Sequence, residues 1–164
     1  MKVDDFRQMY VTQLQQQCSV EDQLVHALPK MAAMVQNNQL KQAIQHHFEE
    51  TKSQRDKVNG LLRRHGAEAR QHQDQSIQTI VHEAEQWGKM VSDPDCRDAA
   101  AIASAQRVEH YEIAAYGTLA TWAKHLGLDE DEKTLHAILE QEKKTDEKLT
   151  KLAKTVVNPE AVQH

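Results

Sequence analysis

The feature that most constrains the fold is an acidic residue inside an apolar helical stripe. Apolar residues recur at spacings of three and four between residues 102 and 123, which predicts one buried face of a long helix. Glu112 lies in the middle of this stripe, and Glu109 lies one turn earlier on the same side. A carboxylate on a buried face is costly unless it is paired, hydrogen-bonded or bound to a metal. The rest of the chain must therefore supply partners for it.

The same periodicity predicts long helices over residues 3–35, 39–64, 98–126 and 131–155. Gly (5) and Pro (3) are scarce and aromatic residues make up 4%, which is typical of helices rather than sheets. Pro29 lies inside the first helix and predicts a kink rather than an end, because the apolar pattern resumes after it. Residues 67–95 are too long for a plain loop and include a short amphipathic pattern.

These elements predict an all-α fold, a four-helix bundle of two antiparallel hairpins joined by a long crossover that contains a short fifth helix. We expect one domain over residues 1–158 and a disordered tail over residues 159–164. The net charge of −5, without a basic stripe, argues against nucleic acid as a partner. No apolar run is long enough to span a membrane, and the N-terminus has no signal pattern, so we expect a cytoplasmic protein.

Each of the four long helices carries one acidic residue on its apolar stripe: Glu21, Glu50, Glu112 and Glu142. Counted from the two predicted turns, near residues 37 and 128, these acids fall at matching levels to within roughly 3 to 5 Å. Gln54 and Asp146 each follow the second glutamate of their hairpin by four residues. The two halves of the chain therefore repeat one pattern of polar residues.

Four carboxylates at one level of a dry bundle repel each other, and cations between them remove this conflict. The alternative is a set of buried or rim glutamates paired with Arg, Lys or Tyr hydroxyls. Because four acids share one level on four stripes, we interpret Glu21, Glu50, Glu112, Glu142 and Asp146 as metal ligands.

Further side chains are candidates for additional ligands or for hydrogen-bond partners of the ligands: Gln54, Glu109, His47 and Tyr116. Glu109 ranks below Glu112, since it is about one turn further off level. His47 is either a ligand or a histidine that plugs the bundle or reaches solvent, and we favour the second interpretation. Tyr116 is either a hydrogen-bond donor or a packing residue, and Glu83 of the crossover is a further candidate ligand.

Several of these segments resemble the YciE/YciF family of bacterial stress-associated ferritin-like proteins. The resemblance is carried by residues 21–30, 47–51 with Gln54, 97–100, 105–119 and 142–146. It implies a ferritin-like four-helix fold, a homodimer and a two-metal centre, but it does not imply a particular reaction. Ferritins and rubrerythrins place histidine where this chain has Ser53 and Thr145, so nitrogen ligands are missing unless His47 or His110 supplies them. Iron or manganese is the expected cofactor, and with so many oxygen donors Mg²⁺ and Ca²⁺ stay open.

Two functions follow from these patterns. The first is a di-iron or dimanganese protein that oxidises Fe²⁺ or removes peroxide, with Gln54 and Asp146 completing or orienting the ligands. The second is a non-catalytic, stress-associated structural or interaction protein with a polar bundle core. Metal content after purification separates the two.

Overall fold

The computed structural model describes residues 3–69 and 73–163, and within these ranges it contains helices and no strand. The helices are α1 (Phe6–Met34), α2 (Asn38–Arg64), α3 (Gln75–Met90), α4 (Pro94–His125), α5 (Asp129–Leu152) and α6 (Asn158–Ala161), with a π-helical turn over Ala153–Val157. None of the described helices is both long and apolar enough to cross a membrane. The prediction of an all-α fold is confirmed.

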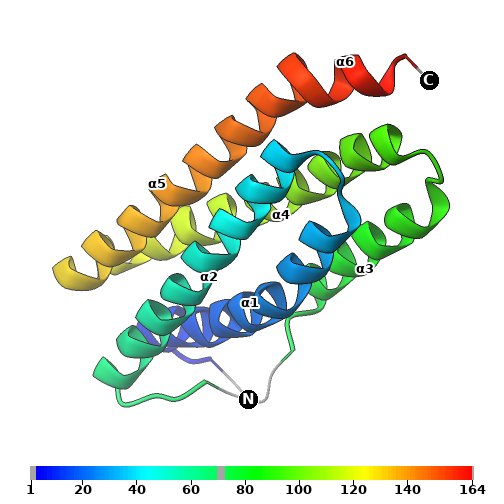
Figure 1. Ribbon diagram of the computed structural model, residues 1–164. Coiled ribbons are helices and arrows are strands. Elements are labelled where there is room, and N and C mark those ends of the chain that lie inside the picture. The colour runs from blue at the N-terminus through cyan, green and yellow to red at the C-terminus, as the bar shows by residue number, and fades with distance from the viewer. Residues whose placement is uncertain (1–2, 70–72, 164) are drawn as a thin grey trace.

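Two antiparallel hairpins make up the bundle, as predicted (Figure 1). One hairpin pairs α1 with α2 and the other pairs α4 with α5, and these are the two most extensive helix contacts in the molecule. The crossover helix α3 runs along the outside of α1 and α4. α1 continues through Pro29 to Met34, in agreement with the periodicity of the sequence.

The helix ends follow from local sequence signals. The side chains of Asp74 and Asp93 accept hydrogen bonds from the backbone N–H groups of Ile77 and Cys96 in the first turns of α3 and α4, and Pro94 is the first residue of α4. Gly66 and Gly127 lie just past α2 and α4 with φ angles of 65° and 68°. This left-handed conformation is easy for glycine and closes the ends of both helices.

Asp74 also fixes the crossover against the bundle. Its carboxylate accepts a hydrogen bond from the Tyr111 hydroxyl of α4 at 3.0 Å, and its backbone N–H donates to the Ser19 hydroxyl of α1 at 2.8 Å. At the opposite end of α3, Asp98 accepts from the backbone N–H groups of Gln36 and Asn37 at 2.9 and 2.7 Å. These contacts hold the crossover and the first turn against α1 and α4.

The C-terminal segment over residues 159–163 differs from the expectation of a disordered tail over residues 159–164, of which residue 164 lies outside the described residues. The chain stays helical through the π-helical turn and α6, which ends at Ala161. Pro159 lies in the first turn of α6, where its missing N–H is tolerated. Val157 is buried within an apolar cluster, so packing extends the ordered chain beyond the fourth long helix.

The core consists of two apolar clusters that occupy different levels of the bundle. One is built around Leu24, Leu28, Leu40 and Ile102, and the other around Tyr10, Leu62, Leu119 and Leu135. Along α2, α4 and α5, buried polar residues lie between the stretches that belong to the two clusters. This polar layer is the part of the bundle that hydrophobic packing does not explain.

Candidate metal centre

Four buried side chains of the polar layer converge on one point between the helices. His47 of α2, Glu109 and Glu112 of α4, and Glu142 of α5 each present one ligand atom, and these atoms all lie within 4.8 Å of one another. All four residues are buried, with exposed fractions of 3% or less. We call these residues the His47 group.

The polar atoms of this group lack ordinary hydrogen bonds. His47 Nε2 lies 3.0 Å from Glu109 Oε1 and 3.8 Å from Glu112 Oε2. Within the described residues, both carboxylate oxygens of Glu109 and Glu112, Oε2 of Glu142 and both ring nitrogens of His47 have no hydrogen-bond partner. Buried polar atoms in folded proteins are almost always satisfied, and each that is not costs about 1–3 kcal/mol. A cation bound among them would satisfy several at once.

The pKa shifts within the group have a common cause. Burial raises the pKa of Glu109 and of Glu112 well above the ordinary value, and the charge of Glu142 raises both further. Burial lowers the pKa of His47, so its imidazole stays neutral, the form that binds a metal. The group therefore fits a metal ion, whose binding would displace protons from the two carboxyls of α4.

Glu21 of α1 lies beside this group and is partly satisfied. Its Oε1 accepts hydrogen bonds from the Tyr116 hydroxyl and from Gln17 Nε2, the latter at 3.1 Å. Its Oε2 has no hydrogen-bond partner in the described part of the chain. Burial and the charge of Glu142 raise the pKa of Glu21 to about 7. Tyr116 is thus the hydrogen-bond donor that the sequence allowed, and burial with the nearby acids raises its own pKa.

Gln54 orients Glu142, in the manner expected for a residue that supports a ligand. Its Nε2 donates to Glu142 Oε1 and lies 3.2 Å from Gln141 Oε1. Gln54 is fully buried on α2, so its amide cannot turn toward solvent. One carboxylate oxygen of Glu142 is held in this way, and the other remains free to bind a cation.

Three of the five predicted ligands lie outside the His47 group: Glu21 beside it, and Glu50 and Asp146 at the edge of the bundle. Glu50 is half-buried, with its carboxylate 3.4 Å from His46 Nε2 and 3.5 Å from the Thr145 hydroxyl. Asp146 is half-buried and accepts a hydrogen bond from Gln106 Nε2 at 3.1 Å, and its other oxygen lies 3.2 Å from Nε2 of the exposed His110. Both acids therefore have partners at the edge of the bundle.

Sequence reasoning placed two members of the group, His47 and Glu109, among the additional candidates rather than among the expected ligands. His47 supplies the nitrogen donor that the sequence left open, and Glu109 is as much a part of the group as Glu112. The available signal was spacing, since Glu109 lies three residues before Glu112 and His47 three before Glu50. The number of residues from the turn matched the acids only to within roughly 3 to 5 Å, which is too coarse to rank two residues one helical turn apart. Glu83, the extra candidate of the crossover, is exposed and does not join the group.

The fold and this buried carboxylate–histidine group define a ferritin-like helical bundle protein. Residues 5–162 match the family described as a domain of unknown function, DUF892, and the chain belongs to this family. A relative in that class is the protein YciF of Escherichia coli K12, which is 38% identical over 162 residues that cover 98% of each chain. The predicted resemblance is confirmed.

Solved structures agree with this assignment. The crystal structure of the E. coli stress protein YciF matches with a TM-score of 0.90 and 38% identity, over 95% of this chain and 99% of that one. YcfI of Rhodopseudomonas palustris matches with a TM-score of 0.88 and 33% identity, over 91% and 95%. A protein of Xanthomonas campestris, at 22% identity and a TM-score of 0.78 over 97% and 98%, shares the fold.

Proposed function

We propose that this chain is a metal-binding, ferritin-like protein of the bacterial stress response that holds iron or manganese in the His47 group. The observation that carries the proposal is the convergence of four buried ligand atoms within 4.8 Å, most of them without hydrogen bonds. One imidazole with several carboxylates suits Fe²⁺ and Mn²⁺ better than an oxygen-only set would. A second ion would draw on the neighbouring acids Glu21 and Glu50.

When bound, iron or manganese would supply one-electron redox chemistry toward dioxygen or peroxide. We propose Fe²⁺ oxidation or peroxide removal as the activity: each Fe²⁺ loses one electron, and the oxidant takes up electrons and protons to become water. The part of this chain is to hold the carboxylates in place. Tyr116 and Gln54 each fix one oxygen of an acid, Glu21 and Glu142 respectively, and leave its other oxygen without a partner in the described chain.

Elemental analysis of protein purified without chelator tests the proposal, followed by competitive loading with Fe²⁺, Mn²⁺, Zn²⁺ and Mg²⁺. We expect stoichiometric iron or manganese, and loss of tight binding in Glu112→Gln. A protein that binds no metal with the four residues intact would overturn the proposal. The polar layer would then be a structural core, and binding to a partner protein would be the better explanation of its role.

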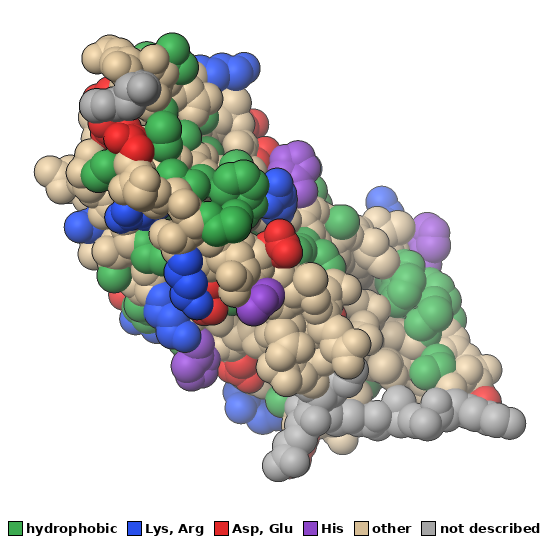
Figure 2. Space-filling view, turned by 90° about the vertical axis from the view of Figure 1, so that its right-hand side faces the viewer, with side chains coloured by type: hydrophobic (Ala, Val, Ile, Leu, Met, Phe, Trp, Pro, Cys, Tyr) green, Lys and Arg blue, Asp and Glu red, His purple; other side chains and the backbone are tan. Residues whose placement is uncertain are grey.

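The homodimer implied by the family resemblance is also a proposal. The face of the molecule in Figure 2 carries acidic, basic and histidine side chains mixed with hydrophobic ones, which suits a protein partner better than nucleic acid. Size-exclusion chromatography with light scattering measures the oligomeric state directly.

A further inference from the structure

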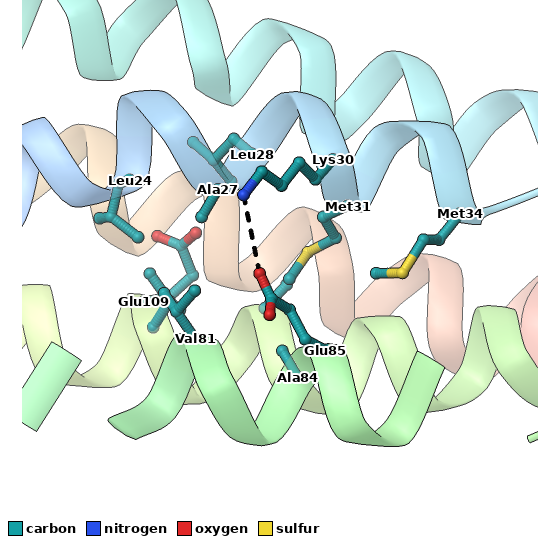
Figure 3. Close-up of a pocket in the computed structure, with 12 residues that line it drawn as sticks. Leu24, Ala27, Leu28, Lys30, Met31, Met34, Val81, Ala84, Glu85 and Glu109 are labelled. Carbon is teal, nitrogen blue, oxygen red and sulfur yellow. Dashed lines mark ion pairs between the residues drawn. The ribbon is translucent and has the colours of Figure 1, made fainter. Parts of the chain in front are cut away.

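A small apolar cavity lies between α1, α3 and α4, beside the His47 group (Figure 3). Its volume of about 20 Å³ is enough to admit one molecule of the size of water. The buried side chains that line it include Leu24, Leu28, Met31, Ala84, Val108 and Glu109. Apart from Glu109, these present only carbon and sulfur atoms to the cavity.

Glu109 connects this cavity to the candidate metal centre. In Figure 3 its carboxylate reaches from α4 toward Leu24 and Ala27 of α1. The same carboxylate lies 3.0 Å from His47 Nε2 and is a member of the His47 group. A molecule inside the cavity would therefore lie against a ligand of the proposed metal.

The outer side of the cavity meets the protein surface at a weak ion pair. Lys30 of α1 and Glu85 of α3 approach to 3.9 Å across this edge, with 69% and 37% of their side chains exposed (Figure 3). Exposed pairs of this kind contribute little stability, so the bridge opens readily. A wider hollow of about 380 Å³ outside shares Ala27, Val81 and this ion pair with the cavity. From the surface inward, the order is therefore the surface hollow, the Lys30–Glu85 ion pair, the apolar cavity and the carboxylate of Glu109.

The lining decides which molecule suits the cavity. A water molecule would fit by volume, but buried waters need two to four polar partners, and the inner lining offers only Glu109. Hydrogen peroxide has two O–H donors and meets the same lack of partners. Dioxygen is small and apolar and needs no hydrogen bonds, and dry apolar cavities take up such molecules.

We propose that this cavity is the route by which dioxygen reaches the His47 group, and that hydrogen peroxide does not enter by it. The inference rests on the proposed function, because the route matters only if a metal binds beside Glu109. It selects dioxygen as the oxidant that the fold admits on the α1–α3 side of the bundle.

Dioxygen itself is the probe for the first test, on metal-free protein. Its paramagnetism speeds the NMR relaxation of nearby methyl groups. Under dioxygen pressure we expect the methyl groups of Met31 and Leu24 to relax at least about 5-fold faster than that of Leu135, a buried leucine of the other apolar cluster. The same pressure of nitrogen is the blank. Equal effects on the methyl groups of all three residues would overturn the proposal.

Two matched substitutions on α1 give the second test. Ala27 lines both the cavity and the surface hollow, so Ala27→Leu places a larger side chain between them, whereas Ala33→Leu adds the same atoms to the exposed groove between α1 and α2. Ala27→Leu should abolish the enhanced relaxation at Met31, and Ala33→Leu should leave it unchanged. Lys30→Ala, at an exposed position, should preserve or increase it.

Iron-loaded protein then separates this inference from the proposed function. Ala27→Leu should slow Fe²⁺ oxidation by dioxygen about 10-fold, while metal affinity and the oxidation rate with hydrogen peroxide stay at wild-type values. A variant that slows both oxidants equally, or neither, overturns the dioxygen route. Failure of the wild type to bind any metal overturns the proposed function instead, and the relaxation measurements still decide whether dioxygen enters.

Discussion

Two groups of buried acid and histidine lie at different levels of this bundle, and their hydrogen bonding differs. One group lies just after the turn between α4 and α5, where Asp131 Oδ2 accepts a hydrogen bond from the Tyr10 hydroxyl at 2.8 Å and lies 2.6 Å from His65 Nε2. The other oxygen, Oδ1, lies 3.6 Å from Arg64 Nη1. We call this set the Asp131 group. In the His47 group the acids face one another and a neutral imidazole instead.

The difference separates a structural contact from a binding site. Asp131 joins α1, α2 and α5 through donors that satisfy it, and the Tyr10 and His65 rings pack nearly perpendicular to each other at a centroid distance of 5.6 Å. The polar atoms of the His47 group lack hydrogen-bond partners within the described residues, which destabilises the metal-free protein and favours a cation that binds there. Buried acid and histidine alone therefore do not identify a metal site; missing partners do.

The largest loss of folding stability is expected when the Asp131 group is disrupted. Asp131→Ala removes the acceptor of Tyr10 and His65 and leaves their polar atoms buried, so it should lower the free energy of unfolding by about 3–5 kcal/mol. Urea denaturation of chelator-treated protein measures this. Glu112→Gln is the control and should not destabilise the metal-free protein. Equal losses in the two variants would remove the distinction between the groups.

The metal-free protein should become less stable as the pH rises, because of the His47 group and Glu21. Folding raises the pKa of Glu21 from 4.5 to about 7, so its contribution is complete below pH 4.5 and lost above pH 7. This change is on the order of 3 kcal/mol. The raised pKa values of Glu109 and Glu112 also lower the stability as the pH rises. His47 has the opposite effect, because its lowered pKa makes the folded protein lose stability as the pH falls.

Denaturation midpoints at pH 5 and pH 8 in the presence of chelator test this dependence. Glu21→Gln should flatten it in part, and saturating metal should reverse it, since metal and protons compete for the same carboxylates. A metal-free protein that gains stability between pH 5 and pH 8 would contradict the assignment of raised pKa values to these acids.

Metal affinity should depend on both acids of α4 to a similar degree. Glu109→Gln and Glu112→Gln should each weaken Fe²⁺ or Mn²⁺ binding about 100-fold, or about 2.7 kcal/mol, because both lie in the His47 group. Isothermal titration calorimetry measures the affinities. Asp131→Asn should bind metal like the wild type. If only Glu112→Gln weakened binding, the ranking of Glu112 above Glu109 by position along the helix would be right, and Glu109 would not be a ligand.

The smallest effect concerns the donor that supports Glu21. Tyr116→Phe keeps the ring and removes the hydrogen bond to Glu21, so metal affinity should fall about 10-fold. Tyr111→Phe is the matched control, because Tyr111 donates to Asp74 of the crossover, away from the group. Affinities that fall equally in both variants would assign the loss to packing or folding.

Much of the fold was predictable, because helix periodicity and turn signals are local. The four long helices, the two hairpins and the crossover helix followed from apolar spacing, and the ends of the long helices lie within four residues of the predicted ones. The order of polar residues along α2, α4 and α5 also placed a polar layer in the bundle. The C-terminal helix α6 was not predictable, since tertiary packing of Val157 sustains it.

The sequence by itself determined which acids share a face with the apolar stripes of four helices and their approximate distance from a turn, because 3.6-residue periodicity can be counted along one chain. Only the tertiary structure decided which of them meet. Glu50 and Asp146 turn to partners at the bundle edge, and His47 and Glu109 turn inward. A rotation of part of a turn decides between these outcomes, and it depends on how neighbouring helices pack, which no single segment of sequence encodes.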